Sequence, residues 1–206
     1  LFPYTTLFRS GLLDENTLLV HSVWADEADL EIIAKSGTAV CHVPESNMKL
    51  ASGVAPAHKM IAKNIRLGLG TDGCASNNVL DMFRSMNSAA KLHKVYTLDP
   101  TVLDAGTVLK MATVKGADAV GMKKETGSLE IGKAADIIIV DTLKPHLVPI
   151  YSPVSHLVYA ATGGDVRHVF IEGKQVVKNR TVLTLDTDEI IKKVSALSGV
   201  IFHESQ

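Results

Sequence analysis

Three side chains able to hold a metal ion or to move a proton stand at the ends of three short apolar segments. The segments are Asn16–His21, Thr38–His42 and Ile65–Asp72. Short apolar runs of this kind are typical of strands buried in a parallel sheet, and the carboxyl ends of such strands lie along one edge. A carboxylate such as Asp72 can bind a cation or accept a proton, and His21 and His42 can donate hydrogen bonds or exchange protons. These residue types predict a site that binds a metal or transfers a proton at that edge.

Each of the three residues also has a purely structural interpretation. A histidine that ends an apolar strand, such as His21, is on general grounds more often a hydrogen-bonded core residue than a catalytic one. His42 is balanced between facing the site and packing within its loop. Asp72 could cap the helix that follows, although Ser76 and Asn77 are better placed for a cap. The elements around these residues therefore have to decide between the interpretations.

Three glycines near Asp72 formally match a dinucleotide-binding pattern. Gly68, Gly70 and Gly73 spell GxGxxG after the third apolar segment. However, Asp72 would place a negative charge where a pyrophosphate meets the backbone N–H groups of the turn. The helix that follows also leads to another helix instead of a strand ending in a ribose-binding acid. The pattern therefore does not indicate a nucleotide site.

The apolar strands alternate with segments that have helical spacing. Helices are predicted over Asp26–Ser36, Ala55–Lys63, Val79–Lys94 and Thr107–Val120, and Pro44–Gly53 is predicted to be a polar loop. This alternation calls for a parallel sheet, either doubly wound or closed into a barrel. An eightfold barrel takes about 250 residues, or about 31 per strand–helix unit, so residues 11–125 have room for three units. The sequence therefore predicts an α/β fold that contains the last three strand–helix units of a (β/α)8 barrel.

The apolar pattern changes after Thr126 from helical spacing to strand alternation. Strands are predicted within 127–141 and at 156–161, and a hairpin is predicted to turn at Glu172–Lys174. The segment Thr187–Leu197 has acidic residues in its first turn and an apolar face, as expected for a closing helix. We therefore assign 11–125 to the barrel, 126–186 to part of a small β domain, and 187–206 to a closing helix and tail.

The composition is that of an ordinary globular chain. Of its 206 residues 46% are hydrophobic, and 21 basic side chains stand against 22 acidic ones. No basic patch indicates a nucleic-acid partner, and no apolar run is long enough to span a bilayer. Cys41 and Cys74 lack the spacing of a metal or redox motif, which favours a reducing cytoplasm. Residues 1–10 show neither periodicity nor a capping signal, so we expect a non-native cloning leader or, alternatively, a natural disordered tail.

Several segments together resemble the carboxyl-terminal part of the amidohydrolase superfamily. They are LLVHSVW, SNMKLASG at 46–53, GLGTDGCASNN followed by LDM, KMATVKGADAVG and GSLEIGKAADIIIVD. The chain is most similar to the branch of methylthioadenosine/S-adenosylhomocysteine deaminases and chlorohydrolases, over residues 11 to about 185. The resemblance implies that the β unit is half of a composite β-sandwich domain.

The resemblance also implies roles for the strand-end residues. Asp72 matches the eighth-strand aspartate, which binds one divalent metal with an HxH pair and a fifth-strand histidine, and His21 matches the histidine that hydrogen-bonds the reacting oxygen. We expect the other ligands, and a glutamate that protonates the substrate ring, to lie before Leu1. The family usually has Asn where this chain has Val43, next to His42, our candidate for substrate contact. The metal is expected to be Zn²⁺, with Fe²⁺ as the alternative.

The predicted function is hydrolytic deamination of an adenine-type ring, as in 5′-methylthioadenosine or S-adenosylhomocysteine. Asp72 would bind the metal and accept the proton of water, and His21 would donate to the oxygen. The alternatives are another ring substrate (guanine, pterin, cytosine or chlorotriazine), or a non-catalytic fragment. We expect a purine-type small molecule as partner, a homo-oligomer of the full-length protein, and no activity from this chain by itself.

Overall fold

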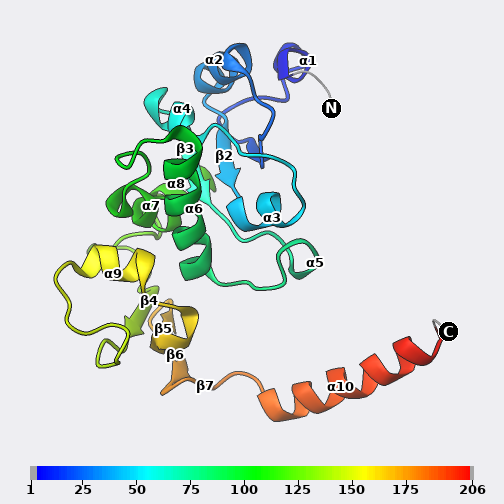
Figure 1. The fold of residues 1–206 in the computed structure, drawn as a ribbon, viewed down its shortest axis with the longest axis vertical. Helices are drawn as coiled ribbons and strands as arrows, with labels where there is room; N and C mark the ends of the chain where they lie inside the picture. The colour runs from blue at the N-terminus through cyan, green and yellow to red at the C-terminus, as the bar shows by residue number, and fades with distance from the viewer. Residues whose placement is uncertain (1–3, 205–206) are drawn as a thin grey trace. The chain divides into compact units, whose positions relative to one another are not determined.

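The computed structural model describes residues 4–204, and within this range the chain forms two compact units (Figure 1). The first unit comprises residues 4–133 together with Thr142–Asp165, and the second comprises Ala134–Asp141 and the chain from Val166 onward. Residues 1–3 of the predicted leader and residues 205–206 of the predicted tail lie outside the described range. The finer boundaries predicted after residues 10, 125 and 186 stay predictions.

A parallel sheet organises the first unit. Within the described residues its strands are β1 (Leu18–Val20), β2 (Ala39–His42) and β3 (Arg66–Leu69), hydrogen-bonded in that order. Val20 is in register with Cys41, and His42 is in register with Leu69. The three predicted strands are therefore confirmed, and their carboxyl ends lie along one edge of the sheet.

The helices of this unit follow the strands as an α/β fold requires. Helix α2 (Glu27–Ser36) begins behind Asp26, whose side chain forms a reciprocal capping box with Asp29, and ends at Gly37 in the left-handed conformation that glycine adopts without strain. Helix α4 (Ala57–Ala62) follows β2. Helix α1 (Tyr4–Arg9) lies in a segment that no periodicity marks as helical.

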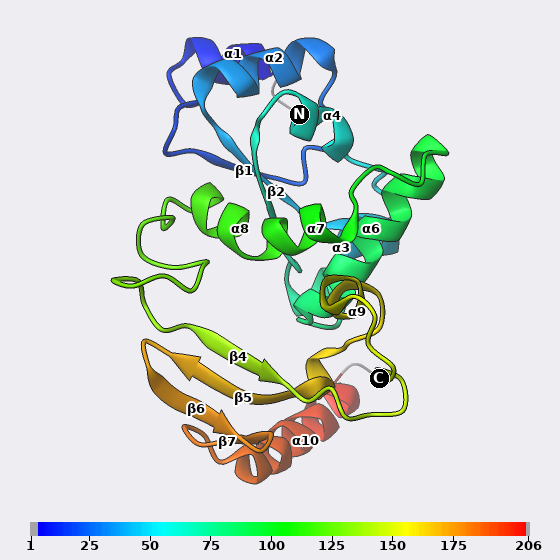
Figure 2. The ribbon, with the colours of Figure 1, turned by 90° about the vertical axis from the view of Figure 1, so that its left-hand side faces the viewer.

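Helices α7 (Ala105–Ala112) and α8 (Val114–Ala119) lie across one face of the sheet (Figure 2). A Cβ at Gly68 would come within 3.2 Å of the Ala119 Cβ and of the Gly116 backbone, so glycine permits this close approach of α8 to β3. The core of the unit gathers side chains that are at most 2% exposed from α2, β2, α4, α7 and α9. They are Leu30, Ile33, Val40, Met60, Val108 and Val158.

The polar segment between β2 and α4 is helical in part, which corrects the predicted loop. Helix α3 (Pro44–Lys49) begins with Pro44, whose fixed φ suits the first helical position and whose missing N–H has no helical partner to lose. Ser46 and Asn47 on this helix are buried. Because its inward face is polar, α3 has no apolar periodicity that would mark it as a helix.

The connection after β3 also differs from the prediction. A short helix α5 (Cys74–Asn77) comes first, and the long helix α6 (Met82–Thr97) begins behind Asp81, which accepts a hydrogen bond from the Phe83 N–H at 2.9 Å. Ser76 and Asn77 therefore do not cap α6. The single helix predicted over Thr107–Val120 is broken into α7 and α8 at Thr113, whose φ of −128° and ψ of −105° are not helical.

The strand predicted at 156–161 is instead part of helix α9 (Pro153–Tyr159), which packs on α6 and α7 in the first unit. Ser152 caps α9 and Pro153 occupies its first turn, and these two helix-start signals outweigh the alternation of the apolar residues. A turn of 3₁₀ helix, η1 (Gly163–Asp165), follows.

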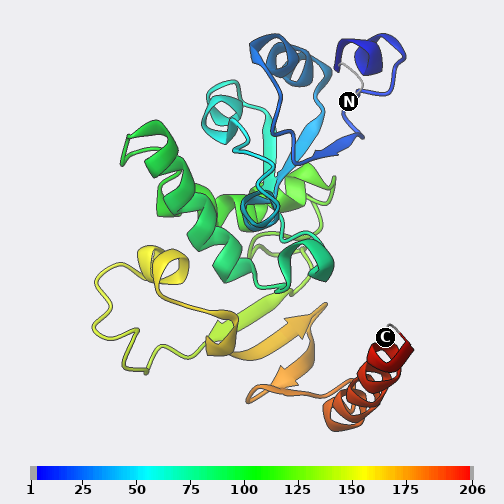
Figure 3. The ribbon, with the colours of Figure 1, turned by 45° about the vertical axis from the view of Figure 1, so that its right-hand side comes forward.

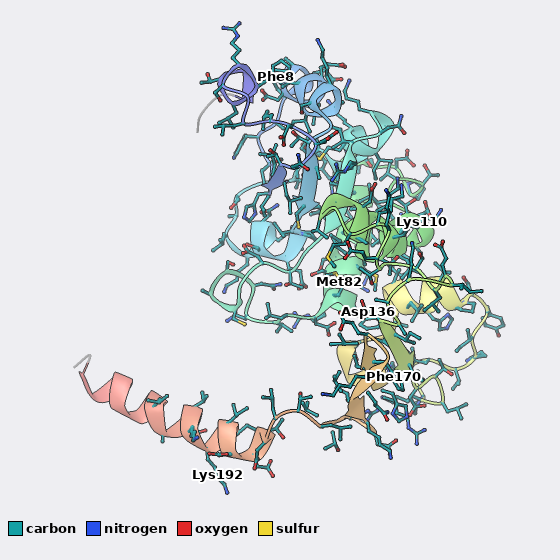
Figure 4. The ribbon with its side chains drawn as sticks, turned by 180° about the vertical axis from the view of Figure 1, so that it is seen from behind. Phe8, Met82, Lys110, Asp136, Phe170 and Lys192 are labelled. Atoms are coloured by element: carbon teal, nitrogen blue, oxygen red, sulfur yellow. The ribbon has the colours of Figure 1, made fainter. Side chains whose placement is uncertain are left out.

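The second unit is built on an antiparallel sheet. Among the described residues its strands are β4 (Ile137–Val140), β5 (Val166–Ile171), β6 (Lys174–Lys178) and β7 (Thr181–Val182), in that order. The hairpin turns where it was predicted, between β5 and β6. The Glu172 N–H donates to Asp136 Oδ1 at 2.8 Å, and Figure 4 labels Asp136 at the start of β4 and Phe170 on β5. The turn is therefore tied to the neighbouring strand.

Helix α10 (Thr187–Glu204) confirms the helix predicted over Thr187–Leu197 and extends it. Figure 4 labels Lys192 on this helix. The apolar residues that defined its predicted buried face are all exposed. They are Ile190, Ile191, Val194 and Leu197. In this structure the helix does not bury the face that suggested a closing role.

Candidate active site

His21 and Asp72 both lie just beyond a strand end, where the backbone turns sharply. The His21 N–H still donates to the Cys41 carbonyl at 3.1 Å, and the chain then leaves the sheet. His21, Ser22 and Asp72 have φ values of 70°, 46° and 64°. Residues other than glycine seldom adopt such values, and strain of this kind is concentrated at functional sites. The turns bring two side chains far apart in the sequence to the same edge of the sheet.

The two side chains face each other without a direct hydrogen bond. His21 Nε2 lies 3.8 Å from Asp72 Oδ2. Each is held by a neighbouring residue of helix α3, which follows the carboxyl end of β2 (Figure 3). His21 Nδ1 lies 2.8 Å from Asn47 Oδ1, and the Ser46 hydroxyl donates to Asp72 Oδ2 at 2.6 Å. Sheet and helix together therefore fix the pair.

The surroundings of Asp72 favour its ionised form. The hydrogen bond from Ser46 and the N–H of Gly73, which donates to Oδ1 at 2.8 Å, lower the pKa of Asp72 to about 2. Both contacts stabilise the charged carboxylate because they donate hydrogen bonds to its oxygens. The side chain is 30% exposed. At neutral pH this site therefore presents an accessible negative charge.

A pocket of about 610 Å³ lies over the pair. Its polar lining includes His21, Ser46, Asn47 and Asp72, and its apolar lining includes Trp24 and Leu50. Pockets that combine an apolar wall with a few convergent polar groups are typical of small-molecule sites. The arrangement suits a small molecule whose polar groups are turned toward His21 and Asp72.

His42 lies away from this pair. It is 1% exposed, and its Nε2 lies 3.0 Å from Nε2 of His93 on α6. Burial, together with the nearby His93, lowers the pKa of His42 to about 3, so its ring is neutral. Successive side chains of a strand point to opposite faces, so the adjacent Cys41 and His42 cannot both point to the same side of the sheet. The structure thus brings His21 and Asp72 together but does not bring His42 to them.

Ser46 and Asn47 are the site residues that sequence reasoning did not single out. In the sequence they stand out only as part of the segment SNMKLASG that carries the family resemblance. The feature that indicates them is a run of polar residues directly after a strand that ends at the same edge as the site. Their partners, however, lie far away in the sequence and become apparent only in the folded chain.

The donor set fits a metal ion in part. Asp72 offers an ionised, accessible carboxylate of the kind that binds divalent cations. Within the part of the chain that the structure describes, no group of three or more His, Cys, Asp or Glu side chains is placed to hold a metal. The described residues by themselves therefore do not form a complete metal site. No helix between residues 4 and 204 has both the length and the apolar character needed to cross a membrane.

Comparison with known proteins gives consistent matches. A model of the amidohydrolase family matches residues 4–176. The chain is 51% identical over 199 residues to 5-methylthioadenosine/S-adenosylhomocysteine deaminase of Syntrophobacter fumaroxidans, covering 97% of this chain and 45% of that protein. It is 50% identical over 183 residues to 5′-deoxyadenosine deaminase of Methanosarcina acetivorans, covering 89% and 42% respectively.

A solved structure agrees with these relatives. The crystal structure of an adenosine deaminase from Xanthomonas campestris with bound zinc superposes with a TM-score of 0.94 at 39% identity. The match covers 97% of this chain and 45% of that one. The chain thus spans about half the length of the curated relatives it matches.

Proposed function

The chain belongs to the amidohydrolase family, and from this we propose that it forms one side of the active site of a metal-dependent hydrolase that deaminates an adenine-type ring. The observation that carries the proposal is the pair at the sheet edge: the ionised Asp72 and the His21 ring, 3.8 Å apart and lining one pocket. A carboxylate can accept the proton of the attacking water, and a neighbouring histidine ring can stabilise the attacking oxygen. Both contributions favour hydrolysis of a C–N bond.

We propose that the parallel sheet of the first unit is part of a (β/α)8 barrel. Its strands are neighbours in chain order, as in a barrel, and helices cover its outer face. In barrel enzymes the active site lies at the carboxyl ends of the strands. His21 and Asp72 occupy this position, which supports a catalytic role for them.

We propose that Asp72 both holds a divalent cation, Zn²⁺ or alternatively Fe²⁺, and moves a proton. When bound, such a cation makes hydroxide available at neutral pH, because it lowers the pKa of water to about 7. The carboxylate of Asp72 would hold the cation and would accept the proton that the attacking water loses. It would then give this proton to the departing amino group, which leaves as ammonia.

His21 acts on the oxygen that attacks the ring. Its Nδ1 is occupied by Asn47, so Nε2 is the nitrogen that faces Asp72 and the pocket. From there a protonated ring, which carries a hydrogen on each nitrogen, would donate a hydrogen bond to the oxygen on which negative charge develops. Such a donor lowers the barrier because it stabilises the transition state more than the ground state.

The substrate class rests on the named relatives. Two of them, each about half identical to this chain, are named for 5′-methylthioadenosine/S-adenosylhomocysteine and for 5′-deoxyadenosine. We therefore propose a 5′-modified adenosine as substrate. Guanine, pterin, cytosine and chlorotriazine rings are the alternatives.

The two free cysteines, Cys41 and Cys74, support a location in the reducing cytoplasm.

The experiment is a substrate panel with a matched pair of variants. The full-length protein is loaded with Zn²⁺, and ammonia release is measured from 5′-methylthioadenosine, S-adenosylhomocysteine and 5′-deoxyadenosine, with guanine and cytosine as comparisons. We expect Asp72→Asn to abolish turnover and to weaken metal retention, because an amide cannot balance the cation's charge or accept the proton.

Asp81→Asn is the matched control, because Asn caps helix α6 as well as Asp does and Asp81 lies outside the pocket. It should retain both metal and rate. Full metal content and a normal rate in Asp72→Asn would refute the assignment. Release from guanine or cytosine alone would refute the substrate class while leaving the family assignment intact.

We also propose that this chain has no deaminase activity by itself. A parallel sheet is stable when its faces are covered and its edges are paired. In the described part of the chain β1 and β3 each pair on one side only, with β2. Metal-dependent ammonia release from residues 11–206 expressed alone would contradict this proposal.

A further inference from the structure

Helix α3 connects the two strand ends that carry the site. Asn47 contacts His21 beyond β1, and Ser46 donates to Asp72 beyond β3. The next turn of the helix reaches the segment after Asp72, where the Lys49 ammonium donates to the Ala75 carbonyl at 3.0 Å and to the side chain of Asn78. The helix is thus fastened on both sides, so its side chains present fixed partners to the site.

The contact between Asn47 and His21 is buried and limited to one atom pair. Asn47 is 2% exposed, and its Oδ1 lies 2.8 Å from His21 Nδ1. Its amide nitrogen is buried and has no hydrogen-bond partner among the described residues. Leaving a buried donor unpaired costs free energy. Of the two polar atoms of the Asn47 side chain, the oxygen is therefore the one that makes a contact, and its partner is His21.

A carbonyl oxygen can only accept a hydrogen bond, so Nδ1 of His21 must carry the proton in this contact. We propose that Asn47 is a positioning residue that keeps a proton on His21 Nδ1 and thereby makes Nε2 the nitrogen that exchanges protons with the reacting atoms. The second nitrogen of a histidine is commonly set by the hydrogen bond of the first. Nε2 is also the nitrogen that faces Asp72, at 3.8 Å.

This tautomer assignment stands on the geometry alone, whereas its consequence for turnover rests on the proposed function. Without Asn47, the proton of a neutral ring is free to move to Nε2, and the ring is free to rotate. The first change blocks the lone pair of Nε2, and the second moves Nε2 from its position. Ser46 fixes Asp72 in the same way from the adjacent position, so one dipeptide orients both side chains of the pair.

The test compares three variants of the full-length, Zn²⁺-loaded protein. Asn47→Leu removes the acceptor and keeps the volume. Asn47→Asp keeps an acceptor and replaces the amide nitrogen, which has no partner among the described residues, with a carboxylate oxygen. Asn87→Leu is the matched control, because the Asn87 amide donates to the Val158 and Tyr159 carbonyls at 3.2 and 3.1 Å, away from the pocket.

The first measurement is the tautomer of His21, from nitrogen NMR of protein labelled with ¹⁵N-histidine. We expect Nδ1 to be protonated in the wild type, in Asn47→Asp and in Asn87→Leu, and to lose its fixed proton in Asn47→Leu. The second is the steady-state rate. We expect kcat to fall by about 10- to 100-fold in Asn47→Leu at unchanged zinc content and with KM changed less than about threefold. Asn47→Asp should recover most of the loss.

The outcomes separate this proposal from the proposed function. A wild-type His21 whose neutral ring carries its proton on Nε2 overturns the inference, even if Asn47→Leu fails to fold. So does an unchanged Nδ1 proton in a folded Asn47→Leu, or an equal loss of kcat in Asn87→Leu. If the NMR result is as expected but the wild type releases no ammonia from any ring, the proposed function fails and the positioning role of Asn47 stands.

Discussion

The buried pair His42 and His93 makes the first unit sensitive to acid. Their Nε2 atoms lie 3.0 Å apart in the core, and neither ring is more than 1% exposed. One neutral ring can donate to the other, but a proton added to either would place a charge in the interior. Burial, with the nearby His93, lowers the pKa of His42 to about 3, and burial, with the nearby His58, lowers that of His93 to about 4.

The sign and size of the effect follow from linkage. Both folded pKa values lie below the ordinary histidine value of 6.5, so the unfolded chain binds more protons between pH 6.5 and pH 4. Stability contributed by the neutral rings is therefore fully present above pH 6.5 and is lost as the pH falls toward the folded pKa values. From pH 7 to pH 5 we expect a loss of about 2 kcal/mol per histidine, or about 3 to 4 kcal/mol for the pair.

The assay is urea denaturation of the full-length protein at pH 7 and pH 5, compared with the double variant His42→Leu/His93→Leu. At about 2 to 3 kcal/mol per molar urea, the pair should lower the wild-type midpoint by about 1 to 2 M over this pH range. The double variant should lack this part of the shift, while titrating groups away from the pair act equally in both. Equal shifts in the two proteins would refute the reasoning.

Three further predictions test other parts of the structure. His21→Ala should lower kcat by about 100- to 1,000-fold while zinc stays bound, measured by steady-state ammonia release and metal analysis; loss of zinc in parallel would make His21 a ligand. Asp165→Asn should lower the free energy of unfolding by about 3 kcal/mol in urea, because it removes a buried carboxylate that accepts from a lysine and a histidine, and an unchanged midpoint would contradict this. Gly70→Ala should cost about 1 to 3 kcal/mol, because its Cβ would lie 2.7 Å from Cys41 Sγ, whereas Gly73→Ala, with nothing within 4 Å, should leave the midpoint unchanged.

The elements that the sequence predicts correctly carry their signal locally. The parallel strands are short apolar runs, helix α2 is bounded by a capping aspartate and a terminal glycine, and the hairpin turns at Glu172 and Gly173. In each case residues within a few positions of one another determine the backbone. The sequence is therefore sufficient to identify these elements and the α/β class.

The errors come from segments whose structure depends on distant contacts. Helix α3 turns polar side chains inward because their partners, His21 and Asp72, lie at other strand ends. Helix α9 was mistaken for a strand because apolar residues at 156–161 suit both structures, and its packing against α6 and α7 decides between them. The secondary-structure propensity of a segment alone does not predict such contacts.

Asp165 shows the same dependence on distant residues. It is buried, and it accepts from Lys144 at 2.6 Å, from His146 at 3.0 Å and from the Thr162 N–H at 2.9 Å. Although burial by itself would raise it, these contacts hold the pKa of Asp165 well below its usual range. Nothing in the local sequence distinguishes this acid from an exposed one, since its charged partner Lys144 and its partner His146 lie in a separate loop.

Two kinds of element, the strands of the sheet and helix α3, position the side chains of the candidate site. The register of β1, β2 and β3 places the backbones of His21 and Asp72 at one edge, yet their side chains remain 3.8 Å apart, too far for a direct hydrogen bond. Helix α3 supplies the missing constraint, because Ser46 and Asn47 hold each side chain separately. This separation leaves His21 Nε2 and the remaining lone pairs of the Asp72 oxygens available to a third group, whereas a direct hydrogen bond between the two side chains would occupy them with each other. The separation of the pair therefore supports our proposal that a ligand contacts both side chains.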